Sequence, residues 1–310
     1  MLTPTTGSIV AQQIIMVWMR SVSTHPIYLM TNKNETNAST EFSTSLAQGL
    51  PLVSIITPSF NQSAYIAATI ESVLSQDYPN IEYIVVDGDS TDGSAEIIER
   101  YADKLAWWVS EKDKGQTNAI NKGFARANGE ILAWLNSDDT YEPGAISAAV
   151  DFLMKNPDVG LVYGDCNVID ENGQKYGAFN AAQTDLEKLQ RGYVHIPQQA
   201  SFWRADLWKE IAPLDDSFYF AMDYDLWTRL ARISELRYLP GQNWANFRLH
   251  SDAKSIAADK HCWNEMMRVH YRDGGSFFSI INAKHIIRKV VAPWWNWRRR
   301  RKMEKALKNK

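Results

Sequence analysis

LVSIITPSFN, residues 52–61, is a largely apolar run that ends in polar residues. The pattern after it is helical, because Ile66, Ile70, Val73 and Leu74 are spaced to share one face. A strand, a loop and a helix are therefore predicted here. The same unit begins again at IEYIVVD (81–87), LAWWVS (105–110) and EILAWLNSDD (130–139).

Helices are predicted after these runs, through Ile97 and Ile98, through Ile120 and Phe124, and from Pro143 at a first turn. Strands that alternate with helices pair in parallel, because parallel strands need long crossover connections that then cover both faces of the sheet. The sequence thus predicts a doubly wound α/β sheet. In such sheets ligands bind beyond the carboxyl ends of the strands.

The second half of the chain predicts antiparallel additions that make the sheet mixed. VGLVYGD (159–165) and CNVID (166–170), followed by the Asn-Gly turn at 172–173, predict a strand and a hairpin. Two helices are predicted further on, one that begins at Asp223 and one within 257–272.

The chain has 310 residues, of which 45% are hydrophobic, and a formal net charge of −3. This composition excludes global disorder and gives no reason to expect wholesale nucleic-acid binding. Cys166 and Cys262 fit no metal-binding spacing, so reduced thiols are expected. No apolar run is long enough to span a membrane, and residues 9–19 make a poor signal peptide, so a cytoplasmic protein is expected.

Three regions are predicted. Residues 1–50 show little periodicity and are expected to be flexible, 51–275 form the α/β domain, and 276–310 form a basic, Trp-rich tail in which Glu304 is the single acidic residue after Lys284. Indole rings prefer the membrane interface and cations attract anionic headgroups, so this tail predicts peripheral attachment to the cytoplasmic membrane face. The alternative is a solvated basic terminus whose Trp residues pack on the domain.

Acidic residues follow several of the predicted strands. Asp138 and Asp139 form a carboxylate pair of the kind that holds Mg²⁺ or Mn²⁺ together with substrate phosphates, although an N-cap with a solvated neighbour is the alternative. Asp87 ends a strand, where a carboxylate can accept hydrogen bonds from a ribose or a base. Asp89 and Asp92 fit turn and capping roles, above all Asp92.

Four segments together resemble family-2 glycosyltransferases of the GT-A fold, in their residues, order and spacing. The resemblance covers roughly residues 53–250. It is carried by PSFN (58–61), VVDGDSTDGS (85–94), DKGQTNAINKGFARANGE (113–130) and LNSDD (135–139).

The resemblance implies a site for a nucleotide-diphosphate sugar, with Mg²⁺ or Mn²⁺ as cofactor. Asp138 and Asp139 match the family's metal-binding motif, and Asp139 is expected to be the direct ligand. The absence of a Gly-rich phosphate loop after the first strand weighs against a kinase, a dinucleotide oxidoreductase or a nucleotidyltransferase. The residues implied to bind the donor are Pro58, Phe60, Asn61, Asp87, Asp89, Lys114, Asn118, Lys122 and Asp138.

Transfer with inversion requires a base that takes the proton of the acceptor hydroxyl. FAMDYDLWTRLA (220–231) resembles the start of the family's catalytic helix and implies Asp223 as this base, although Met222 stands where family members often carry Glu. Asp225 is expected to point elsewhere. The alternative is that Asp223 only interacts with the helix dipole.

Two further segments resemble the family. HIPQQASFWRADLW (195–208) implies an acceptor site in which Gln198 and Gln199 bind sugar hydroxyls and Trp203 stacks on a ring, unless Trp203 belongs to the core. FRLHSDAKS (247–255) implies that His250 approaches the diphosphate or the metal, unless it is a structural histidine.

The sequence therefore predicts an inverting glycosyltransferase that acts on a saccharide or lipid-linked saccharide in cell-surface polysaccharide or lipid-linked glycan synthesis. Two alternatives stay open: a sugar-nucleotide nucleotidyltransferase, and a non-catalytic carbohydrate-binding relic of the fold.

Overall fold

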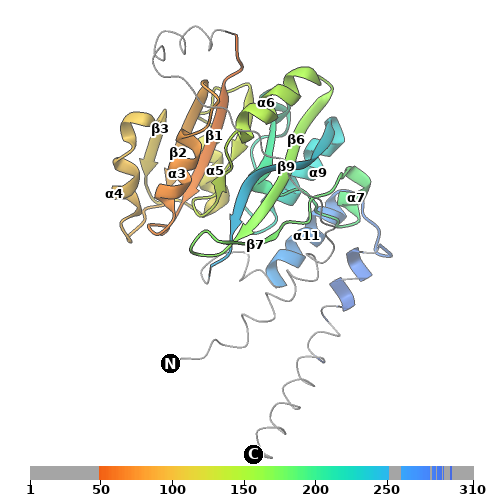
Figure 1. Cartoon of the computed structure of the whole chain (residues 1–310). Helices are drawn as coiled ribbons and strands as arrows, with labels where there is room; N and C mark the ends of the chain where they lie inside the picture. Colours follow the sequence, from red (N-terminus) through yellow and green to blue (C-terminus); the bar gives the residue numbers. More distant parts are fainter. Residues whose placement is uncertain are drawn as a thin grey trace, which may run out of the picture.

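A computed structural model describes residues 49–250 and 260–279, the short pieces 281–283 and 285–287, and residues 289 and 294 (Figure 1). The predicted N-terminal extension lies outside the described residues except for Gly49 and Leu50, and so does most of the predicted tail.

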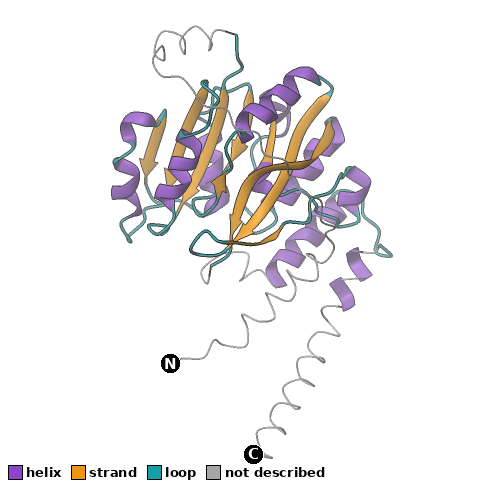
Figure 2. Cartoon of the chain, viewed as in Figure 1, coloured by secondary structure: helices purple, strands orange, loops and turns teal. Residues whose placement is uncertain are grey.

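The described residues form one nine-stranded sheet in the order β3-β2-β1-β4-β8-β6-β9-β5, with β7 paired to β6 (Figure 2). The strands are β1 (Val53–Ser59), β2 (Ile81–Asp87), β3 (Trp107–Ser110), β4 (Ile131–Trp134), β5 (Thr140–Tyr141), β6 (Val159–Ile169), β7 (Lys175–Ala178), β8 (Ser201–Arg204) and β9 (Glu235–Arg248).

The first half of the sheet is parallel, as predicted. β1 pairs in parallel with β2 on one side and β4 on the other, and β2 pairs with β3. Every residue of β1 and β4 is buried, which is the expected state of parallel strands covered on both faces. The loops that follow β1, β2 and β4 therefore meet at one edge of the sheet.

The second half makes the sheet mixed, as predicted. β6 is one continuous strand of 11 residues, whereas the sequence predicted separate runs at 159–165 and 166–170. It pairs antiparallel with β7 and β8 and in parallel with β9. The predicted turn after it is present, with Gly173 at a φ of 82°.

Helices cover both faces of the sheet, with α3 and α6 in front of it in the view of Figure 1 and α5 and α9 behind it. Two expectations are corrected. Leu74 ends α3 and is 36% exposed, and α6 begins after Pro143, because Gly144 precedes it at a φ of 79°. The helices are α3 (Ile66–Leu74), α4 (Ser94–Glu99), α5 (Gln116–Phe124), α6 (Ala145–Lys155), α7 (Leu186–Gln190), α8 (Ala205–Ile211), α9 (Met222–Ile233) and α11 (Lys260–Arg272).

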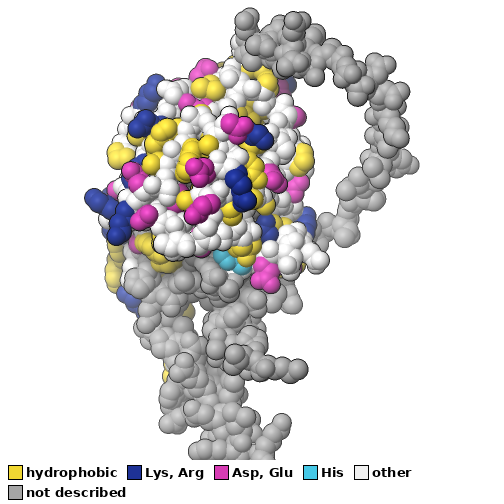
Figure 3. Space-filling model, turned by 90° about the vertical axis from the view of Figure 1, so that its left-hand side faces the viewer, with side chains coloured by type: hydrophobic (Ala, Val, Ile, Leu, Met, Phe, Trp, Pro, Cys, Tyr) yellow, Lys and Arg dark blue, Asp and Glu magenta, His cyan; other side chains and the backbone are white. Residues whose placement is uncertain are grey.

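The face of the molecule at the β3 edge of the sheet mixes acidic and basic side chains (Figure 3). Within the part of the chain that the structure describes, no helix is long and apolar enough to cross a membrane. Neither Cys166, which is buried in β6, nor Cys262 forms a disulfide.

Candidate active site

The two adjacent carboxylates after β4 have different environments. Asp139 is fully buried, and its carboxylate accepts hydrogen bonds from Arg248 N (2.9 Å), Gln199 Nε2 (2.9 Å) and Asn136 Nδ2 (3.4 Å). Burial and the charge of Asp138 raise the pKa of Asp139 well above its usual range, although these hydrogen bonds partly oppose the shift. Asp139 is thus held inside the protein.

Asp138 instead faces His250, with 3.1 Å between Oδ2 and Nε2. The Asp138 side chain keeps 18% of its surface exposed. The ring of His250 lies 4.7 Å from that of Tyr65, which precedes α3, so loops after three strands converge on this pair. Arg248 adds a hydrogen bond from Nε to the carbonyl of Asp138 (2.9 Å). Asp138 is therefore the carboxylate of this pair that could reach a cation, with Nε2 of the buried His250 beside it.

The loop after β2 is organised by Asp87, which is fully buried. Its carboxylate accepts from Ser90 N (2.9 Å), Ser90 Oγ (2.6 Å) and Ser110 Oγ (2.7 Å). Asp92 accepts from Ser63 and Ser94, which is the turn role predicted for it, whereas the N-cap residue of α4 is Gly93. Asp87 fixes the path of this loop, and exposed Asp89 lies within it at a φ of 67°.

Gly88 brings three loops together. A Cβ atom on Gly88 would lie 2.8 Å from Asp113 Oδ2 and 3.3 Å from the ring of Phe60. Phe60 is 59% exposed, and Asn61 next to it binds the backbone of Thr91 through Oδ1 (3.0 Å). An exposed aromatic ring beside a carboxylate is suited to a nucleobase, because the ring can stack and the carboxylate can accept hydrogen bonds.

The remaining predicted donor residues lie around α5 or in β1. Pro58 is buried in β1, and Lys114 is exposed before α5. Lys122 pairs with Glu111 (2.8 Å), and Asn118 donates to Asp216 (3.2 Å). Asn118 and Lys122 thus contact other parts of the protein, and their predicted contacts with a donor stay a prediction.

Gln198 and Gln199 are each 7% exposed and bind the loop after β4. Gln198 donates to the carbonyl of Trp134 (2.6 Å), and Gln199 donates to Asp139. Asn136 joins them, since its amide donates to Gln198 (3.3 Å) and accepts from Gln116 Nε2 (2.7 Å). Asn136 and Gln116 were not predicted as site residues, and their only signal was their place in the quoted motifs.

Trp203 is a core residue, which corrects its predicted contact with an acceptor. Its side chain is fully buried, and its ring lies 5.6 Å from those of Phe124 and Trp134 and 6.0 Å from that of Trp227. β8 places it there between β4 and β6, where it pairs with Leu132 and Leu161. A ring with no exposed surface cannot stack on a sugar.

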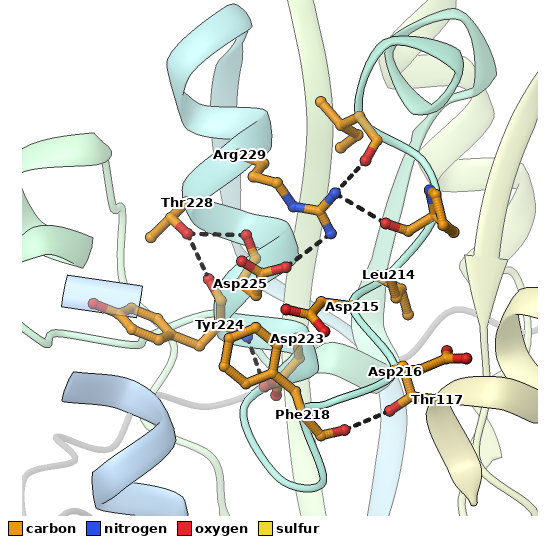
Figure 4. Close-up of polar contacts among 12 residues, drawn as sticks. Thr117, Leu214, Asp215, Asp216, Phe218, Asp223, Tyr224, Asp225, Thr228 and Arg229 are labelled. Carbon is orange, nitrogen blue, oxygen red and sulfur yellow. Dashed lines mark hydrogen bonds and ion pairs between the residues drawn. The ribbon is translucent and has the colours of Figure 1, made fainter. Parts of the chain in front are cut away.

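Asp223 lies in the first turn of α9, as predicted, and is half-buried. Its Oδ1 accepts from the backbone N–H of Tyr224 (2.6 Å). Figure 4 shows the carboxylates of Asp223 and Asp225 pointing apart. Asp225 is 1% exposed and forms ion pairs with Arg229 (2.8 Å) and Arg272, so it is structural.

The acidic site fits a hard divalent cation that is shared with a substrate. Among the described residues, no group of three or more His, Cys, Asp and Glu side chains is arranged to hold a metal by itself. Mg²⁺ and Mn²⁺ bind nucleotides through one or two protein ligands together with phosphate oxygens. Asp138 and His250 fit that pattern, whereas Asp139 is enclosed by protein donors.

Residues 54–209 match the sequence model of glycosyl transferase family 2. The chain belongs to this family. An uncharacterized glycosyltransferase of Rickettsia felis is 31% identical over 79% of this chain, and Escherichia coli chondroitin synthase is 30% identical over 67%. The family-2 chain spans only 41% and 30% of the lengths of these two proteins.

Solved structures confirm the GT-A fold of this family-2 chain. S. aureus TarS 1–349 in complex with UDP-GlcNAc has a TM-score of 0.57 at 19% identity and covers 72% of this chain and 66% of its own. The mannosyltransferase PcManGT of Pyrobaculum calidifontis, in complex with GDP-Man and Mn²⁺, has a TM-score of 0.56 at 19% identity. The match covers 93% of this chain and 79% of PcManGT.

Proposed function

We propose that the chain is an inverting glycosyltransferase that moves a sugar from a nucleoside-diphosphate donor to an acceptor hydroxyl. The observation that carries this proposal is the contact between Asp138 and His250 at the carboxyl end of β4. Phe60 and Gly88, in the loops after β1 and β2, lie at the same edge of the sheet, where a nucleotide could extend from ring to carboxylate.

Asp138 and His250 would hold Mg²⁺ or Mn²⁺, which would supply positive charge to the departing diphosphate. Asp139 supports this arrangement from behind, because it holds the backbone of Arg248, two residues before His250. The Mn²⁺ bound with GDP-Man in PcManGT agrees with this choice of ion.

Asp223 is the proposed base. Its carboxylate takes the proton of the acceptor hydroxyl while that oxygen forms a bond to the anomeric carbon. The bond from this carbon to the diphosphate oxygen breaks, and its electron pair leaves with the nucleoside diphosphate. Attack opposite the leaving group inverts the anomeric centre.

The substitution Asp223→Asn tests this role. Transfer from UDP-GlcNAc or GDP-mannose to a panel of p-nitrophenyl glycosides, followed as release of UDP or GDP with Mn²⁺, should fall about 100-fold or more, because a general base contributes roughly 10²–10⁴. Donor binding should persist. Normal transfer by this variant would refute the assignment, and release of pyrophosphate from a nucleoside triphosphate and a sugar phosphate would favour the nucleotidyltransferase.

The acceptor that we propose belongs to cell-surface polysaccharide or lipid-linked glycan synthesis. Chondroitin synthase among the relatives supports a polysaccharide product. The described residues after α11 support a lipid surface, because Phe277 is 62% and Phe278 94% exposed next to a strongly basic sequence from Lys284 onward.

The membrane proposal predicts sedimentation of the full chain with vesicles that contain phosphatidylglycerol, more than with pure phosphatidylcholine vesicles. Phe278→Ser should reduce the bound fraction, because it removes exposed apolar surface next to the basic segment. Tyr176→Ser, on β7 and 56% exposed in the wild type, is the matched control. Equal sedimentation with both vesicle types would contradict the proposal.

A further inference from the structure

The segment 212–221 leads from α8 to the proposed base and is fastened on one side by α5. Thr117 Oγ1 donates to the carbonyl of Phe218 (2.8 Å; Figure 4). Asn121 binds both backbone groups of Leu214, accepting from its N–H and donating to its carbonyl, each at 2.9 Å. These contacts hold the segment at Leu214 and at Phe218.

The last part of the segment is held by one carboxylate from α11. Glu265 accepts from three consecutive backbone N–H groups, those of Tyr219 (3.0 Å), Phe220 (2.7 Å) and Ala221 (2.9 Å). The first N–H groups at a helix start have no partner within the helix, and negative charge is favourable there. Glu265, more than 40 residues away in the sequence, thus holds the three residues that lead into α9, the last of which is its N-cap residue Ala221.

Arg268, one turn further along α11, holds the same segment. Its guanidinium donates to Asp215 and Ser217 and lies 3.8 Å from the ring centre of Phe218. Burial raises the pKa of Asp215, but the hydrogen bonds of Ser217 and the contact with Arg268 outweigh this and lower it. The charged form of Asp215 is therefore favoured beside Arg268.

Helix α11 is itself joined to α9. Arg272 donates to Asp225 Oδ1, and the buried carboxylate of Asp225 also pairs with Arg229. Arg229 donates onward to the carbonyl of Pro213 (3.2 Å), at the start of the segment. These contacts join α9, α11 and the segment into one connected unit. Asp223 lies two residues after Ala221, the last residue that Glu265 contacts.

We infer that Glu265 is a positioning residue for Asp223, an inference that rests on the proposed function. Glu265 sets the backbone path into α9 and so fixes where the carboxylate of Asp223 lies against an acceptor. A displacement of about 1 Å at a reacting group can cost roughly 100-fold in rate. α11 lies beyond residues 54–209, which match the family. Through Glu265 it becomes part of the catalytic unit.

Two measurements on the full chain test this role. Glu265→Ala should accelerate hydrogen exchange at the amides of residues 219–221, because their acceptor is removed. In the transfer assay with UDP-GlcNAc or GDP-mannose and Mn²⁺, the same substitution should lower kcat about 10- to 100-fold while the donor KM stays within twofold. Glu265→Gln, which retains one accepting oxygen, should recover part of kcat.

Glu210→Ala is the matched control, since Glu210 is an exposed carboxylate on α8 just before the segment. It should leave exchange and kcat unchanged. Unchanged exchange at 219–221 in Glu265→Ala would overturn the inference even if that variant is less stable. If Glu265→Ala kept a normal kcat while Asp223→Asn was inactive, the positioning role of Glu265 would be overturned and the base role of Asp223 would stand. An active Asp223→Asn would instead remove the proposed base.

Discussion

At the scale of single residues, Asp138 and Asp139 differ although they are neighbours. The motif predicted that the pair is functional, and the structure supports the pairing of Asp138 with His250. Asp139 was expected to be the direct ligand, but it is the carboxylate that turns toward Arg248, Gln199 and Asn136. The partners Arg248 and Gln199 are far from Asp139 in the sequence, so the sequence does not show which carboxylate they contact.

Paired substitutions should separate the two roles. Asp138→Asn should keep the melting temperature of the unliganded chain but lose the stabilisation that UDP or GDP gives only with Mn²⁺, because it weakens a cation ligand. Asp139→Asn should lower the unliganded melting temperature, because it disturbs a buried hydrogen-bond network worth about 1–3 kcal/mol. Melting curves of both variants measure this. Loss of the Mn²⁺-dependent stabilisation in Asp139→Asn but not in Asp138→Asn would show that Asp139 is the direct ligand.

Trp203 shows another limit of sequence reasoning. An aromatic residue in a predicted acceptor segment can face a ligand or the core, and its residue type is the same in both cases. Its place in β8, between β4 and β6, decides the question. The pairing of these strands joins segments about 40 to 70 residues apart, which a local pattern does not reveal.

At the scale of elements, the parallel half of the fold was predictable and the rest was less so. β1 and β2 are short apolar runs, each followed by a helix, and their bounds follow the pattern. The length of β6 was missed because polar Asp165 and Asn167 interrupt its apolar pattern, while pairing with β9 keeps it continuous. The contact of Glu265 on α11 with the segment before α9 has no sequence signal, because it is made to backbone N–H groups.

The contact between the loops after β1, β2 and β3 makes a separate prediction. Gly88→Ala should raise the Kd for the nucleoside diphosphate several-fold, because the new methyl group displaces Asp113 and the ring of Phe60. The melting temperature without ligand should change little, since the nearest atom is the end of a side chain. Isothermal titration with UDP and GDP measures the effect, and unchanged affinity would place the nucleobase elsewhere.

At the scale of the whole molecule, the GT-A domain connects its proposed donor edge to its proposed base through the protein. The donor edge consists of the loops after β1, β2, β3 and β4, and the base stands at the start of α9. α5 contacts both the donor edge and the segment before the base. It begins directly after the loop that follows β3, and its Asn118 and Asn121 bind Asp216, which precedes α9. The family resemblance predicted the two ends of this arrangement but not the connection between them.

The most direct test of the central claim is the melting temperature of the full chain with UDP, GDP, dTDP or CMP, each with and without Mn²⁺. A ligand that binds only the native state stabilises it by about 2.7 kcal/mol at 100 times its Kd. We predict that at least one nucleoside diphosphate raises the melting temperature with Mn²⁺ and has little effect without it. No shift with any of the four, on a folded sample with Mn²⁺ present, would contradict a nucleotide-sugar site.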